Sequence, residues 1–149
     1  MWRIFGIVFF CNKDHFVAEN GKSFNESAIK HFLTTKGIAL YDTAEVVIRH
    51  KNNASDQFLE IVTPVDLKKI FEQIPTCNTI VTTGQKATET LMELIGAEKL
   101  PFIGGSMDVF FLNRMFRCYR MPSSSRAYPK SIIEKAAVYR QLFSECAML

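Results

Sequence analysis

Helical spacing of apolar residues recurs along the chain and predicts five helices. Capping residues define their ends, with Ser, Thr or Asn at the start and Gly or Pro at the stop. The predicted helices cover about 26–35 (Ser23 or Asn25 as N-cap, Gly37 as stop), the end of 52–61, 64–74 (Thr63 as N-cap), 85–95 (Gly96 as stop) and a last one that begins at Pro129. For the last helix the pattern predicts a Ser131–Glu134 capping box and an inward face of Ile132, Ile133, Ala136, Ala137 and Phe143.

Short apolar runs between these helices predict strands. GIALYDT (37–43) and NTIVTTG (78–84) are predicted to be buried strands, and DVFFLNRMFRCYRM two strands around a turn at Asn113 and Arg114. This alternation favours a single three-layer α/β/α domain, residues 1–149, with a mostly parallel central sheet. Ligands bind at the carboxyl ends of such strands, so the candidate sites are 41–43, 82–84 and 121–123.

The composition excludes several classes of protein. The chain is 48% hydrophobic and 22% charged, as a globular protein with a sizeable core would be, and its net charge of +3 permits an acidic partner without requiring one. Its four cysteines form no Cys-x-x-Cys pair and its three histidines have no ligand spacing, so no metal is expected. The apolar run MWRIFGIVFFC is far shorter than the roughly 20 residues that span a bilayer. We therefore expect a cytoplasmic protein with reduced thiols, no cofactor and no membrane partner.

The segment YRMPSSSRAYPK (119–130) carries the strongest candidate chemistry. Pro122 restricts the backbone, and Ser123, Ser124 and Ser125 offer hydroxyl and N–H groups. Small hydroxyls, free amides and cations beside a helix N-terminus suit a phosphate, and the cations here are Arg120, Arg126 and Lys130. The alternative is an ordinary strand-to-helix connection whose serines compete to cap the helix.

The other two strand ends give weaker signals. Asp42 follows a predicted buried strand and could accept a hydrogen bond from a ring N–H at a pocket rim. It could equally cap the next turn or pair with Arg49. The TTGQK segment (82–86) lacks the length and spacing of a Walker loop, and a tight turn with a solvated Lys86 is the alternative.

Three segments in this order, GIALYDT, IVTTGQKA and YRMPSSSRAYP, resemble motifs of the uracil-DNA glycosylase superfamily, above all its mismatch-specific and hypoxanthine/uracil-type branch. The likeness covers roughly residues 2–143. It implies an α/β/α fold around a four-stranded parallel sheet. It also implies hydrolysis of the N-glycosidic bond of uracil, hypoxanthine or a mismatched base in double-stranded DNA, during base-excision repair in a bacterial-type cytoplasm and nucleoid. No metal or cofactor is needed, because such bases leave as stabilised anions.

The resemblance also implies roles for individual residues. A loop that presses into the DNA minor groove would comprise Met121, Pro122, Ser123, Ser124, Ser125 and Arg126, and we call 121–126 the serine loop. Its serines would hold the phosphates that flank an extruded nucleotide, and Arg126 or a neighbour would help to fill the gap in the base stack. Asp42 stands where many members carry a base-reading Asn, and Met1 stands where an aromatic residue would stack on the flipped base.

The first motif of the family has no counterpart here. It comprises a central strand, a Gly-x-x-Pro turn that positions the water and a stretch that ends in Asn-x-Phe-Trp, whose last two places fall on Met1 and Trp2. The water-activating residue would then lie before Met1, and unpaired strand edges would remain. A longer natural protein, a replacement strand from 4–10 or a strand from a second copy in a homodimer would each answer this, and we favour the first.

Three functions follow as hypotheses. The leading one is a DNA glycosylase-like protein, with weak or no activity expected from residues 1–149 alone. The second is a catalytically silent DNA-binding remnant that keeps the serine loop. The third is an unrelated α/β domain that binds a nucleotide or phosphate.

Overall fold

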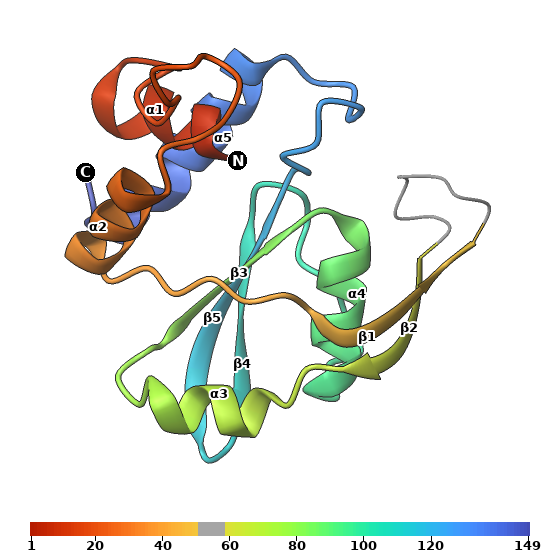
Figure 1. Ribbon diagram of the computed structural model, residues 1–149. Helices are drawn as coiled ribbons and strands as arrows, with labels where there is room; N and C mark the ends of the chain where they lie inside the picture. The colour runs from red at the N-terminus through yellow and green to blue at the C-terminus, as the bar shows by residue number, and fades with distance from the viewer. Residues whose placement is uncertain (51–58) are drawn as a thin grey trace. The chain divides into compact units, whose positions relative to one another are not determined.

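The computed structural model describes residues 1–50 and 59–149 (Figure 1). The described residues form a mixed α/β fold of five helices and five strands in two sheets. Two compact units share them: unit 1 comprises Met1–Leu40 and Pro122–Leu149, and unit 2 comprises Tyr41–Met121. None of the helices in the described ranges has the length and apolar character that a membrane crossing requires.

Unit 1 consists of three helices around an aromatic core. They are α1 (Trp2–Phe10), α2 (Glu26–Lys36) and α5 (Ile132–Glu145). The buried ring of Phe5 lies 5.4–6.3 Å, centroid to centroid, from five other rings, those of Trp2, Phe9, Phe32, Tyr139 and Phe143. Edge-to-face and tilted contacts of this kind add to area burial, which explains why this short chain carries so many phenylalanines.

The capping signals locate two of these helices correctly. The Asn25 side chain, and not Ser23, accepts from the Ala28 N–H at 3.0 Å, and Gly37 ends α2 with φ 66°. The Ser131–Glu134 capping box is confirmed, with α5 beginning at Ile132 and not at Pro129. Side-chain hydrogen bonds at helix starts are local, so the sequence alone reveals them.

The predicted inward face of α5 is only partly right. Ala136 and Phe143 are buried, whereas Ala137 is exposed and Ile133 is 64% exposed. The buried stripe instead runs through Lys135, Ala136, Tyr139, Leu142 and Phe143. This i, i+3/4, i+7 pattern follows from the packing of α5 against α1, where Arg140 donates to the carbonyls of Ile7 and Val8.

The segment 4–10 forms no replacement strand, because it lies within helix α1. Its buried residues Ile4, Phe5 and Val8 have helical spacing, and this outweighs the strand propensity of the β-branched and aromatic residues.

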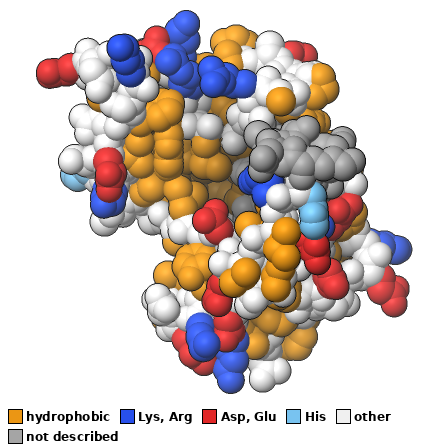
Figure 2. Space-filling view, turned by 45° about the vertical axis from the view of Figure 1, so that its right-hand side comes forward, with side chains coloured by type: hydrophobic (Ala, Val, Ile, Leu, Met, Phe, Trp, Pro, Cys, Tyr) orange, Lys and Arg blue, Asp and Glu red, His pale blue; other side chains and the backbone are white. Residues whose placement is uncertain are grey.

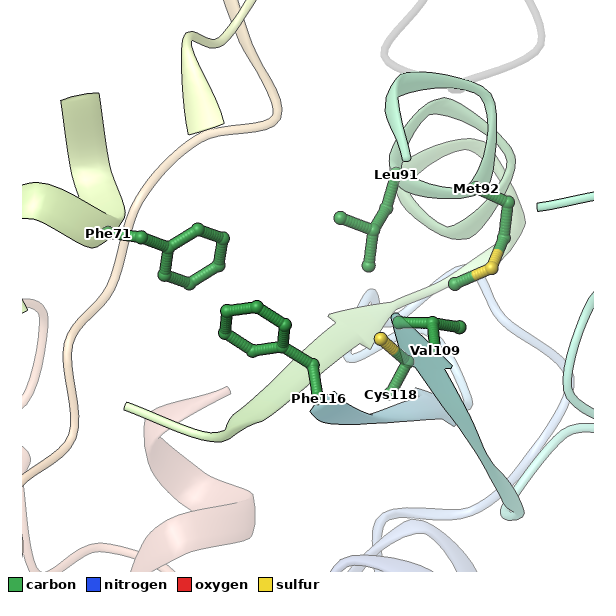
Figure 3. Packing of buried hydrophobic residues seen from close by; sticks show 6 residues of the cluster. All are labelled: Phe71, Leu91, Met92, Val109, Phe116 and Cys118. Atoms are coloured by element: carbon green, nitrogen blue, oxygen red, sulfur yellow. The ribbon is translucent and has the colours of Figure 1, made fainter. Parts of the chain in front are cut away.

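Unit 2 contains a three-stranded sheet with the order β3-β5-β4. β3 (Thr79–Thr83) is parallel to β5 (Arg114–Met121), and β4 (Ser106–Phe111) is antiparallel to it. Helices α3 (Leu67–Gln73) and α4 (Gln85–Leu94) contribute to a core with one face of this sheet, formed by Phe71, Leu91, Met92, Val109, Phe116 and Cys118 (Figure 3).

A two-stranded antiparallel ribbon completes unit 2. It pairs β1 (Ala44–Arg49) with β2 (Leu59–Pro64). Hydrophobic side chains of this ribbon reach the surface (Figure 2), namely those of Val46, Val47, Ile48 and Val62. In the described residues β3–β5 is the one parallel pair, so a mostly parallel sheet and a three-layer arrangement are not confirmed.

The strand predicted at 37–43 is wrong. Gly37 ends α2, an extended non-strand segment follows, and the next strand starts at Ala44. Leu40 and Tyr41 are 46% and 68% exposed. A strand needs a neighbour to pair its N–H and C=O groups, and none of the described strands pairs with this segment.

Two predicted helix boundaries are also wrong. Thr63 and Pro64 close strand β2, and the Asp66 side chain caps α3 by accepting from the Lys69 N–H at 3.2 Å. The sequence also predicts a helix at the end of 52–61. Residues 52–58 lie outside the described residues, and 59–61 belong to strand β2 instead. The ladder with β1 overrides the local Thr-Pro signal here.

The prediction of a strand at 78–84 and of the β4–β5 hairpin is confirmed. The hairpin turn is Leu112–Asn113, with φ 50° and 59°, and not Asn113 with Arg114. Two successive left-handed residues are typical of a type I′ turn, which suits the twist of the strands.

Leu112→Asn should stabilise this hairpin. A left-handed conformation costs roughly 1–2 kcal/mol in an ordinary L-residue, and Asn relieves part of it. We expect the free energy of unfolding to rise by about 0.5–1 kcal/mol, measured by denaturant unfolding. Leu112→Val is the control and should lower stability, since a β-branched residue adopts positive φ least readily.

Candidate nucleic-acid interface

Two of the three candidate strand ends meet in unit 2. β3 and β5 run in parallel with Thr83 opposite Met121, and the Gly84 N–H donates to the Met121 carbonyl at 3.0 Å. The chain leaves β3 through Gly84, whose φ of 94° starts α4, and leaves β5 through the serine loop. The sheet therefore brings 82–84 and Met121 to the same edge.

Hydrogen bonds within the fold occupy the threonine hydroxyls at the 82–84 turn. The Thr82 and Thr88 hydroxyls lie 2.8 Å apart, and both are buried. Thr82 also donates to the Tyr119 carbonyl and Thr88 to the Gly84 carbonyl, at 3.1 and 2.8 Å. These polar groups hold α4 against the sheet and are not available to a ligand.

The serine loop is held by its own hydroxyls. The Ser123 hydroxyl accepts from the Ser125 N–H at 3.3 Å, and the Ser125 hydroxyl accepts from the Ala127 N–H at 3.2 Å. Such short side-chain to backbone bonds stabilise turns in place of regular structure. Pro122 is buried, whereas Ser125 and Arg126 are exposed.

Several donors of this loop remain open. Within residues 1–50 and 59–149, the N–H groups of Ser123, Ser124 and Arg126 make no hydrogen bond, nor does the Arg126 guanidinium. Three backbone donors and a cation within four residues suit the oxygens of a phosphate. The loop thus keeps the chemistry that its sequence suggested.

The helix N-terminus next to the loop does not contribute to an anion site. Helix α5 starts at Ile132, and its capping box places the Glu134 carboxylate on the Ser131 N–H at 2.8 Å. Hydrogen bonds from Ser131, from its side chain first and then its backbone, lower the pKa of Glu134 and keep that carboxylate charged. A phosphate at this position would meet a negative charge, which corrects the expectation that the serine loop works with the helix N-terminus.

Two side chains of α5 anchor the loop. The Tyr139 hydroxyl donates to the Pro122 carbonyl at 3.1 Å, and the Lys135 ammonium donates to the Ser125 carbonyl at 2.6 Å. Both side chains are buried, and burial raises the pKa of Tyr139, so its hydroxyl stays a donor. Neither residue was among those predicted from the sequence, because the apolar pattern indicated a different buried face of α5. The spacing of Ala136, Tyr139, Leu142 and Phe143 is the signal that would have found them.

The predicted base-contacting residues are Asp42 and Met1. Asp42 is exposed and precedes β1 instead of following a strand, and in the described residues it forms no hydrogen bond or ion pair, with Arg49 or otherwise. Met1 is half-buried at the start of α1, where its carbonyl accepts from Ile4 and Phe5. Asp42 belongs to unit 2 and Met1 to unit 1.

Each unit has a hollow of its own. One, of about 330 Å³, is in unit 2 beside 95–99 and 107–110, and the other, of about 390 Å³, is in unit 1 beside α1, Lys36, Arg140 and Leu149. Neither is lined by Asp42, Met1 or the serine loop. No cluster of three or more metal-binding side chains occurs in the described part of the chain.

Comparison with known proteins gives no family: no family model matches the chain, and no curated protein or solved structure is significantly similar to it.

Proposed function

We propose that the protein binds duplex DNA through the serine loop and acts as a DNA glycosylase-like protein on deaminated or mismatched bases. One observation carries the proposal. The loop follows strand β5, its Pro122 and Ser125 carbonyls accept from Tyr139 and Lys135 of α5, and the N–H groups of Ser123, Ser124 and Arg126 have no partner in the described residues. Phosphate contacts of this kind set the position of a protein on DNA.

The proposed reaction is hydrolysis of the N-glycosidic bond. A water oxygen bonds to the sugar C1′ while the C1′–N bond breaks and its electron pair leaves with the base. The water gives up a proton, which leaves a hydroxyl on C1′, and the departed base takes up a proton. The serine loop would hold the phosphates beside the extruded nucleotide and so offset the cost of flipping, which is least at a mismatched pair. Asp42 would accept from a base N–H. The proposal includes a three-layer α/β/α arrangement in which β3 and β5 are adjacent parallel strands of a larger sheet.

A catalytically silent DNA-binding module is the second candidate. It is favoured by Asp42, which is exposed in an extended segment and lines neither of the two hollows. In this case the loop grips DNA and no bond is broken.

Base release by the wild-type chain and by Asp42→Ala tests the proposal. The substrates are duplexes with uracil, hypoxanthine or a G:T pair, and free base is measured by chromatography beside the binding affinity at low salt. We expect release to fall about tenfold or more in Asp42→Ala, since a hydrogen bond to a charged group is lost. Asp42→Asn keeps an acceptor and is the matched control.

The outcomes separate the candidates. Binding without release from any substrate leaves the silent module. No binding to duplex DNA at low salt contradicts both, since phosphate contacts are strongest there. Binding of nucleotide or inorganic phosphate in place of DNA would point to the unrelated α/β domain.

A further inference from the structure

Lys135 is a lysine in an unusual setting. It is 4% exposed and forms the N-terminal end of the buried stripe of α5. Its ammonium donates to the Ser125 carbonyl at 2.6 Å and lies 5.5 Å from the centre of the Tyr128 ring. Both contacts are to the serine loop and the residues just after it.

This ammonium has no acidic partner in the described part of the chain, where every ion pair involves other residues. Lysine is almost never fully buried unless it is paired, because the charge loses its hydration. A methionine has a similar length and would fill the same place without that loss. Stability alone therefore does not explain a lysine here.

Two contacts hold one peptide group of the loop: the Ser125 carbonyl accepts from the Lys135 ammonium at 2.6 Å and, less closely, from the Tyr128 N–H at 3.3 Å. The peptide bonds of this loop are trans, and in a planar trans peptide the C=O and the following N–H point in opposite directions. Because Lys135 draws the Ser125 carbonyl toward α5, the N–H of Arg126 faces away from the helix. In the same way the Tyr139 hydroxyl draws in the Pro122 carbonyl, so the Ser123 N–H faces away.

The two N–H groups that face away from α5 are among those that have no partner in residues 1–50 and 59–149. Donors without a partner beside the exposed Arg126 side chain suit anionic oxygens.

We propose that Lys135, assisted by Tyr139, is the positioning residue of the serine loop, and that it presents the Arg126 N–H to a DNA phosphate. The identity of the ligand rests on the proposed function, whereas the effect of Lys135 on the conformation of the loop does not depend on DNA.

The variants Lys135→Met, Lys135→Arg and Lys22→Met test this role. Lys22 is exposed in the same unit and provides the same loss of charge without contact to the loop. Trypsin cleavage after Arg126, followed by mass spectrometry without DNA, reports the loop conformation. Affinity for a duplex that carries an abasic-site analogue reports phosphate binding.

For Lys135→Met we expect an unchanged or higher melting temperature, about tenfold faster cleavage after Arg126 and about tenfold weaker binding. Lys135→Arg keeps a charged donor, so its cleavage rate after Arg126 and its DNA affinity should both be close to those of the wild type. Lys22→Met should resemble the wild type. Faster cleavage without DNA binding by any variant would support the positioning role and contradict the proposed function. Wild-type cleavage in Lys135→Met would overturn the positioning role.

Amide hydrogen exchange of the wild-type protein gives a second test that needs no variant. The Arg126 amide should exchange fast in the free protein and slow down when the duplex is added. An Arg126 amide that is already protected in the free protein would contradict the outward N–H and with it the inference.

Discussion

Phe116→Ala should lower the free energy of unfolding of unit 2 by about 3–5 kcal/mol, the usual cost of deleting a buried ring. The Phe116 side chain is 1% exposed, and its ring centre lies 4.6 Å from that of Phe71. The Arg114 guanidinium lies 4.4 Å from the centre of the Phe116 ring and donates to the carbonyls of Pro75 and Cys77. The substitution therefore leaves a cavity and also removes the surface on which Arg114 rests.

The Cys118 thiol provides the measurement. It is fully buried, and burial raises its pKa to about 12, so a thiol reagent should label it only when unit 2 opens. Labelling as a function of denaturant, read by mass spectrometry to separate it from Cys11, Cys77 and Cys146, gives the unfolding free energy. Phe110→Ala is the matched control on the same hairpin, because Phe110 is 66% exposed, and should change stability by no more than about 0.5 kcal/mol. Equal losses in the two variants would show that the core is not where the structure has it.

The double variant Arg126→Gln, Lys130→Gln should weaken duplex binding about thirtyfold at low salt. Each exposed cation near a phosphate is worth roughly 1 kcal/mol in water, so two such contacts give about 2 kcal/mol. The slope of log affinity against log salt should also become shallower by about 2, since two fewer counterions are released. Both side chains are exposed, and the fold should not change.

A second double variant, Lys13→Gln, Lys22→Gln, makes the same change of net charge elsewhere in unit 1 and is the control. Its salt slope should equal that of the wild type. If the two double variants lose the same affinity and slope, binding follows net charge, and the serine loop is not the DNA-binding surface.

Features with local causes are predictable from this sequence. A side chain that bonds to the backbone three residues away depends on nothing else, so Asn25 and the Ser131–Glu134 box mark their helices correctly. The strand-to-helix turn at Gly84 also has a local cause, because its φ of 94° is a backbone conformation that suits glycine. The serine loop belongs here too, since Pro122 and three serines cannot continue either neighbouring element.

Features that need a partner are not predictable in this way. The run 37–43 has strand propensity, but in the described residues no strand lies beside it, so Asp42 does not stand at the end of a strand. Thr63 and Pro64 carry a good helix-start signal, yet pairing with β1 makes them the end of β2. Propensity is weaker than a ladder of backbone hydrogen bonds, and the sequence does not show which ladders form.

The sequence by itself determined where the candidate loop lies and which donors it carries, because composition and backbone restriction are properties of 121–126 alone. Only the tertiary structure decided which of those donors are open. Lys135 and Tyr139 reach the loop from α5, ten residues from Ser125 and seventeen from Pro122, and by binding two carbonyls they turn the following two N–H groups away from the helix. That orientation depends on the face that α5 buries, and the packing of α5 within unit 1 selects this face.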